Sequence, residues 1–320
     1  MSIAAFSPWQ QRAYDQAVAA LDAGRLGHGL LICGPEGLGK RAMAQQLALH
    51  VLESERPAGE ARTAQLLAAG THPDFRLVSF IPNRTGDKLR TEIVIEQIRE
   101  VSQKLSLTPQ YGAAQVVIID PADAINRSAC NALLKTLEEP SPGRYLWLIS
   151  AHPQRLPATI RSRCQRLEFR LPPHDEALAW LQRHGHAAAA AAQALEAARG
   201  HPGLADRWLR DDGLALRKTT ARDLVRLEQG EASVLETAQR WSDEQADARL
   251  RHAADWVLAQ ASGGLTDAAR LHKLAAWFDA ANRTRDLLRT TVRADLAMVE
   301  LLQHWTGSPR AAPRNKQESR

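Results

Sequence analysis

The stretch Gln115–Pro140, which reads QVVIIDPADAINRSACNALLKTLEEP, decides the fold. It opens with a continuous apolar run, Val116 to Ile119, which predicts a buried strand of a parallel sheet that ends at Asp120. Apolar residues then recur at helical spacing and predict a helix over 126–139, with Ala129, Leu133 and Leu137 on its buried face. ATP-hydrolysing proteins hold Mg²⁺ with a carboxylate at the end of such a strand. The sequence therefore raises the question whether this chain is a working ATPase.

A second motif lies upstream, where GLLIC at 29–33 predicts another buried strand and is followed by GPEGLGK at 34–40. These residues match the phosphate-loop pattern GxxxxGK, between a strand and a helix predicted over 40–52. Glycines at Gly34, Gly37 and Gly39 would let backbone N–H groups converge on phosphate oxygens, and Lys40 adds a positive charge. The next position, where Ser or Thr usually binds Mg²⁺, is Arg41, and arginine cannot ligate a cation.

Strands and helices alternate through the first half of the chain. Further strands are expected at 75–80, 145–150 and 166–169, with helices at 8–21, 60–69, 95–105 and 156–162. This alternation predicts an α/β fold, a doubly wound parallel sheet of about five strands with helices on both faces.

Leu171-Pro172-Pro173 marks a boundary, and only helical patterns follow it. We expect an α/β domain over 1–171 and a small helical domain over 172–212, in which helices at 174–184 and 187–199 precede a third starting at 204. An all-α domain over 213–306 should have its tryptophans in the core, and 307–320 should be a disordered tail.

The composition is that of an ordinary soluble protein, with 44% hydrophobic and 24% charged residues among 320. A net charge of +5 permits contact with DNA or an acidic protein but does not establish it. The three cysteines show no CxxC spacing, which favours a reducing cytosol without disulfides. No apolar run is long enough to span a membrane and the first residues lack a signal-peptide layout, so we expect a cytoplasmic location.

Three motifs together carry a family resemblance: NALLKTLEEP at 131–140, AHPQRLPATIRSRCQRLEF at 151–169 and THPDF at 71–75. They resemble the bacterial clamp-loader branch of the AAA+ proteins, over residues 1 to about 210. The resemblance implies an AAA+ module with a helical lid, followed by a collar domain for oligomerisation. It also implies partners: motor (gamma/tau) and delta subunits in a five-subunit ring, and through that complex a sliding clamp and primed DNA, as part of a DNA polymerase holoenzyme in a bacterial replisome.

Within that branch the chain resembles a non-hydrolysing subunit. A motor has a Mg²⁺-binding hydroxyl where this chain has Arg41, and a water-activating Glu after Asp120, where this chain has Pro121. A motor's lid also carries an arginine near residues 200–205, which here read GHPGLA. Asp120 is then vestigial, Asp123 is displaced by three positions, and no intrinsic ATPase activity is expected. An active gamma/tau-type motor stays the alternative; other AAA+ machines share the sheet but lack the paired motifs.

The resemblance gives one residue a catalytic role in trans. In this family the arginine of the Ser-Arg-Cys motif, here Arg163, reaches the nucleotide site of the neighbouring subunit and stabilises charge on the γ-phosphate. Such an arginine finger contributes roughly 10³–10⁵ in rate. The alternative is that Arg163 only pairs with a nearby carboxylate of its own chain.

Cofactor binding stays open at the phosphate loop. Either Gly34, Gly37, Gly39 and Lys40 bind nucleotide weakly without turnover, or the loop is kept only because its turn suits the fold. Relatives carry a four-cysteine zinc module before the THPDF motif, but residues 53–70 contain no cysteine. We therefore expect no zinc, no metal site and no required cofactor. Arg127, near the start of a helix that faces the ring interior in relatives, is a candidate for phosphate-backbone contact.

Overall fold

The computed structural model describes residues 6–54, 60–83, 85–86, 89–262, 267–288, 290 and 292–307. The chain forms two compact units, Met1–Arg207 and Trp208–Arg320, which are described separately here. The domain boundaries expected after residues 171 and 212 stay predictions, and the tail expected from 308 onward lies outside the described residues. No helix in the described ranges has both the length and the apolar character needed to cross a membrane.

A five-stranded parallel sheet with strand order β2-β3-β4-β1-β5 forms the centre of the first unit, as predicted. Its strands are β1 (Gly29–Cys33), β2 (Phe75–Val78), β3 (Gln115–Ile119), β4 (Arg144–Ser150) and β5 (Gln165–Glu168). The second strand ends two residues before the predicted position. Val78 pairs with Ile119, the last residue of β3, so the chain beyond Val78 has no strand left to pair with.

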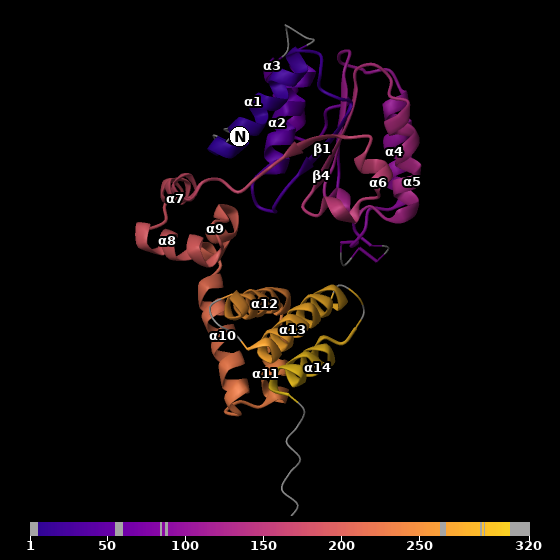
Figure 1. The fold of residues 1–320 in the computed structure, drawn as a ribbon. Helices are drawn as coiled ribbons and strands as arrows, with labels where there is room; N and C mark the ends of the chain where they lie inside the picture. Colours follow the sequence, from indigo (N-terminus) through magenta and orange to yellow (C-terminus); the bar gives the residue numbers. More distant parts are fainter. Residues whose placement is uncertain are drawn as a thin grey trace, which may run out of the picture. The chain divides into compact units, whose positions relative to one another are not determined.

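Helices cover both faces of this sheet, which confirms the predicted fold class (Figure 1). One face carries α1 (Pro8–Asp22), α2 (Lys40–Glu53) and α3 (Glu60–Ala68); the other carries α4 (Ile95–Ser106), α5 (Arg127–Glu138) and α6 (Ala158–Arg161). Strand β1 shows why: Leu30 and Ile32 belong to the core under α1 and α2, whereas Leu31 and Cys33 belong to the core under α4 and α5. A strand buried on both faces has to be apolar throughout.

The THPDF motif is a structural element. Asp74 is 1% exposed and accepts hydrogen bonds from the backbone N–H groups of Gln110 (2.8 Å) and Tyr111 (2.7 Å). The ring of His72, also buried, accepts from the N–H of Asp74 at 3.1 Å. The buried carboxylate therefore fixes the turn that leads into β3 to the start of β2, and each of its two oxygens has a hydrogen-bond partner there.

Three short helices follow the sheet: α7 (His174–Arg183), α8 (Ala188–Ala197) and α9 (Pro202–Arg210). The last begins two residues earlier than predicted, because Pro202 takes the first helical position, where its fixed φ and missing N–H cost nothing. Helix α7 is joined to α1 by Arg12, whose guanidinium donates to both carboxylate oxygens of Glu176 at 2.7 and 2.9 Å.

The second unit is helical throughout its described residues, as expected, with α10 (Gly213–Gln229), α11 (Val234–Trp241), α12 (Ala246–Ser262), α13 (Ala268–Leu287) and α14 (Ala294–Thr306). Its core contains Trp241, Trp277 and Trp305, and Trp256 packs against that core. The prediction that these four tryptophans serve packing is confirmed.

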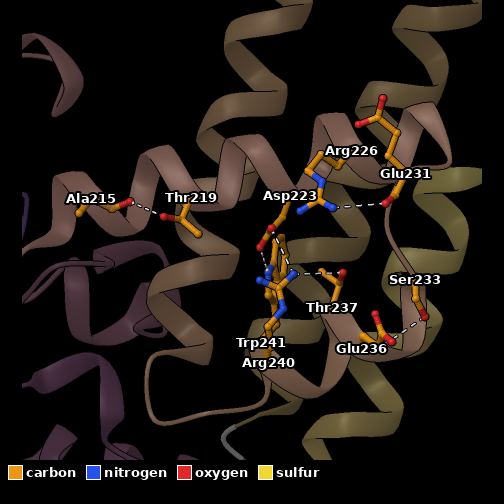
Figure 2. Close-up of polar contacts among 10 residues, drawn as sticks. All are labelled: Ala215, Thr219, Asp223, Arg226, Glu231, Ser233, Glu236, Thr237, Arg240 and Trp241. Atoms are coloured by element: carbon orange, nitrogen blue, oxygen red, sulfur yellow. Dashed lines mark hydrogen bonds and ion pairs between the residues drawn. The ribbon is translucent and has the colours of Figure 1, made fainter.

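A buried carboxylate joins two helices of this unit (Figure 2). Asp223 on α10 is 3% exposed and accepts hydrogen bonds from the indole N–H of Trp241 (3.0 Å) and from the guanidinium of Arg240 (3.2 Å), both on α11. Because a buried carboxylate needs such partners, this pairing of residues fixes how α10 and α11 meet.

Candidate functional site

The phosphate loop joins β1 to α2, and its three glycines all have positive φ, +135° at Gly34, +77° at Gly37 and +80° at Gly39. Two of them also lack the space for a side chain. A Cβ at Gly34 would lie 2.2 Å from the carbonyl oxygen of Phe169, and one at Gly39 would lie 2.2 Å from Nε2 of Gln10. The backbone of Phe169 thus demands glycine at Gly34, whereas at Gly39 the amide of Gln10 could move aside and the positive φ is what favours glycine.

The ammonium group of Lys40 is hydrogen-bonded to the backbone of its own loop. Its side chain is buried, and Nζ donates to the carbonyl oxygens of Gly34 and Pro35, each at 2.6 Å. Burial lowers the pKa of Lys40 because it disfavours the charged form, while the carboxylates of Asp120, Glu36 and Asp123 act in the opposite direction. Two donor positions of the ammonium group are therefore taken by backbone oxygens of the same loop.

Arg41 pairs with Asp120 at the tip of β3. Its Nε donates to Oδ2 of Asp120 at 2.5 Å, and the side chains are 47% and 15% exposed, respectively. The residue that replaces the metal-binding hydroxyl thus places a positive charge on the carboxylate that would face a metal ion. The two sequence features, a lost hydroxyl and a retained Asp120, are two halves of one ion pair.

Asp123, the carboxylate nearest to Pro121 that the sequence singled out, is bonded through one of its oxygens to the end of β4. Oδ1 of Asp123 accepts from the hydroxyl of Ser150 at 2.7 Å and from the N–H of Ala151 at 3.3 Å. These contacts hold Asp123 against the end of β4, where it serves the turn after that strand.

The helical segment after the sheet packs directly onto the loop. A Cβ at Gly203 would lie 2.0 Å from the carbonyl oxygen of Gly37, and a Cβ at Gly37 would lie 3.6 Å from the ring of His201. Burial lowers the pKa of His201, which favours the neutral ring. The sequence GHPGLA, which lacks the motor's arginine, thus supplies the close contact that covers Gly37.

Helix α1 holds the loop from another side, through contacts that the sequence analysis missed. The indole N–H of Trp9 donates to the carbonyl oxygen of Leu38 at 3.0 Å, and Nε2 of Gln10 donates to that of Gly39 at 3.1 Å. The only sequence signal was local: Ser7 and Gln10 have the spacing of a capping box, and Oε1 of Gln10 does accept from the N–H of Ser7 at 3.0 Å.

Arg163 lies at the opposite end of the sheet, between α6 and the start of β5. Its side chain is 36% exposed, and Nη2 lies 2.7 Å from Oε1 of Glu138, the last residue of α5. Nη1 donates to the carbonyl oxygen of Thr159 at 3.0 Å. The pairing with a carboxylate of the same chain, which the sequence left open, is present; the role in trans stays a prediction.

The residues on either side of Arg163 fix its backbone. Cys164 is 8% exposed and belongs to the core under α4 and α5, and burial raises the pKa of its thiol to about 11. Ser162 donates to the carbonyl oxygen of Thr159 at 3.1 Å. Gly29 leaves room for the chain, since a Cβ there would lie 3.2 Å from the carbonyl oxygen of Arg163. The Ser-Arg-Cys turn is thus anchored on both sides and presents its arginine at the surface.

Two further expectations concern DNA and metal. Asn126 caps α5 by accepting from the N–H of Ala129 at 3.0 Å, and Arg127 is exposed at the first helical position. Contact of Arg127 with DNA stays a prediction. Within the described ranges, no three side chains among His, Cys, Asp and Glu are grouped to hold a metal ion, and the expectation of no zinc stays a prediction too.

The chain is similar to subunits of bacterial DNA polymerase III. It is 42% identical over 183 residues to the DNA polymerase III subunit delta' of Pseudomonas aeruginosa, which is 55% of this chain and 52% of that protein. It is 34% identical over 223 residues to the subunit delta' of Escherichia coli, which is 68% of this chain and 65% of that protein. It thus matches about half to two thirds of the length of these relatives.

A solved structure of a DNA polymerase III gamma-subunit-related protein from Thermotoga maritima covers 91% of this chain and 99% of its own, with a TM-score of 0.43 and 15% identity. The family model described as DNA polymerase III, delta subunit, matches residues 9–173. The chain therefore belongs to this DNA polymerase III family, on the branch of the delta' subunits.

Proposed function

We propose that this chain is a non-hydrolysing clamp-loader subunit of a bacterial DNA polymerase III holoenzyme, acting in the cytoplasm. It assembles with motor (gamma/tau) and delta subunits into a ring that loads a sliding clamp onto primed DNA. Its membership of the delta' branch supports this assignment. The observation that carries the non-hydrolysing part is the ion pair between Arg41 and Asp120.

That pair bears on hydrolysis because a phosphate-loop ATPase needs a divalent cation next to the loop lysine. Here a guanidinium contacts the carboxylate, no hydroxyl follows Lys40, and Asp123 is engaged with Ser150. An ATP molecule would meet neither its cation nor a base to activate water. The chain therefore hydrolyses no ATP by itself.

The contacts of the phosphate loop also argue against nucleotide binding, which the sequence left open. Lys40 is bonded to loop carbonyls, and Gly37 is covered by Gly203. A nucleotide would have to break the first contacts and displace the second. We propose that the loop is retained as a packing element of the fold and that the chain requires neither nucleotide nor zinc.

The remaining catalytic contribution lies in Arg163, which acts on a neighbour. The fixed turn and the partly exposed guanidinium suit a donor that reaches a phosphate across a subunit interface. In this proposal Arg163 stabilises charge on the γ-phosphate of the adjacent motor's ATP.

A reconstituted ring tests the function. Steady-state ATP hydrolysis by motor, delta and this chain, with clamp and primed DNA, is compared for wild type, Arg163→Ala and the control Arg166→Ala, which removes an exposed arginine of β5. We expect hydrolysis to fall at least tenfold in Arg163→Ala, to stay near wild type in the control, and to be absent for the isolated chain. Hydrolysis by the isolated chain that is lost in Lys40→Ala would show a motor instead.

A further inference from the structure

The contact between Arg163 and Glu138 suggests how the arginine is controlled. We propose that Glu138 is a positioning residue that holds Arg163 in the free chain and competes for it with the phosphate of the neighbouring subunit's nucleotide. This inference rests on the proposed role of Arg163 in trans. In this inference Glu138, the last residue of α5, sets how readily Arg163 binds the neighbour's phosphate.

The competition follows from charge. Nη2 of Arg163 lies 2.7 Å from Oε1 of Glu138, so the two side chains form a pair without net charge. A phosphate gains most from a guanidinium whose charge and donors are free. Arg163 therefore cannot give its full interaction to a phosphate while it keeps its contact with Glu138.

The pair is also easy to exchange. Its side chains are 36% and 48% exposed, and ion pairs this open to water add little to stability. A nucleotide phosphate in a subunit interface, shielded from water, is a stronger partner for the guanidinium. Glu138 thus orders Arg163 in the free chain but yields it when the interface forms.

The surrounding structure confines this exchange to two side chains. Leu137, next to Glu138, is 2% exposed, and Cys164, next to Arg163, is 8% exposed. Both belong to the core under α4 and α5, and the two residues meet around Gly29, where a Cβ would lie 3.0 Å from Leu137 and 3.5 Å from Cys164. The backbones of α5 and of the Ser-Arg-Cys turn therefore stay in place while the ion pair opens.

The chain offers a matched control in Glu139, an exposed residue that follows Glu138 at the end of α5. Both Glu138→Gln and Glu139→Gln remove one negative charge from the same surface. Only the first removes the carboxylate that pairs with Nη2 of Arg163, and it leaves the bond from Nη1 to the carbonyl oxygen of Thr159 in place. An effect of general surface charge would appear in both variants.

The test is steady-state hydrolysis by the reconstituted ring over a range of ATP concentrations. Glu138→Gln should lower KM for ATP about two- to fivefold with kcat unchanged, because it strengthens contacts made before and during the reaction alike. Glu139→Gln should leave both constants unchanged. In the Arg163→Ala background Glu138→Gln should have no effect, since its partner is gone.

The outcomes separate this inference from the proposed function. If Arg163→Ala leaves the ring's hydrolysis unchanged, the role of Arg163 in trans is wrong, and the role of Glu138 with it. If Arg163→Ala lowers hydrolysis but Glu138→Gln leaves KM unchanged, raises it, or acts equally in the Arg163→Ala background, only the role of Glu138 is wrong. Gel filtration of each ring confirms that the variants still assemble.

Discussion

Two arginine–carboxylate pairs lie at opposite ends of the same sheet, and we propose opposite roles for them. Arg41 and Asp120 meet where β3 ends, next to a loop whose lysine is bonded to its own carbonyls. Arg163 and Glu138 meet where β5 begins, on a turn with a buried anchor and an exposed arginine. In the proposed function, the first pair helps to keep a nucleotide and its cation out of the chain's own phosphate loop, and the second keeps a charge available at the surface.

The two pairs differ in the exposure of the carboxylate and not in that of the arginine, since Arg41 is 47% exposed and Arg163 36%. Asp120 is 15% exposed and sits at the end of a buried strand, whereas Glu138 is 48% exposed at the end of a helix. Removing water strengthens a charge pair and also raises the cost of breaking it. We therefore expect the pair at Asp120 to be harder to break than the pair at Glu138.

The largest expected effect concerns the loop glycines. Gly34→Ala should destabilise the chain by about 4 kcal/mol or more, because the new Cβ would meet a backbone oxygen at 2.2 Å. Gly37→Ala, with its nearest contact at 3.6 Å, should cost about 1–2 kcal/mol through its positive φ. Urea denaturation measures both, with Gly112→Ala, which has open space around it, as the control. Equal losses of unfolding free energy at Gly34 and Gly37 would contradict the idea that the loop is a packing element of the fold.

The burial of Cys164, which anchors the Ser-Arg-Cys turn, should make the stability of the protein depend on pH in alkaline solution. Burial raises the pKa of Cys164 to about 11 from 9.0, so the folded state holds the thiol proton more tightly than the unfolded state. This contribution is fully present below pH 9 and is lost as the pH rises to 11, by about 2–3 kcal/mol in total. The difference in unfolding free energy between wild type and Cys164→Ala should shrink over that range. A difference independent of pH would mean that the thiol is not buried as described.

The smallest effects compare the two ion pairs directly. A double-mutant cycle with Arg41→Ala and Asp120→Ala should give a coupling of about 1–2 kcal/mol, and one with Arg163→Ala and Glu138→Ala about 0.5 kcal/mol or less. Thermal unfolding of the isolated chain measures both cycles. A stronger coupling at Arg163 than at Arg41 would reverse the comparison.

The sequence predicted the framework of the first unit well, because short-range patterns encode it. The apolar run before Asp120, the helical spacing of Leu133 and Leu137 and the motif GPEGLGK each describe one local element. Errors of two residues occurred where a partner decides the end of an element, as at Val78, or where proline starts a helix, as at Pro202.

The contacts that define the site could not be predicted from local sequence patterns. Gln10 on Gly39, Gly203 on Gly37 and Glu138 on Arg163 each join residues at least 25 positions apart. No periodicity or motif links such positions, and a carboxylate near Arg163 could be suspected but not named. The loss of the metal-binding hydroxyl was visible at Arg41, whereas its ion pair with Asp120 required the fold.

One measurement tests the central claim most directly: ATP hydrolysis by the reconstituted ring, with Lys40→Ala and Arg163→Ala compared side by side. The account predicts that Arg163→Ala lowers the rate of hydrolysis at least tenfold while Lys40→Ala leaves it near wild type. The reason is that the Ser-Arg-Cys turn acts on the neighbour's ATP, whereas the chain's own phosphate loop binds none. A large loss in Lys40→Ala with little change in Arg163→Ala would contradict the account and would show that the chain's own loop does the work.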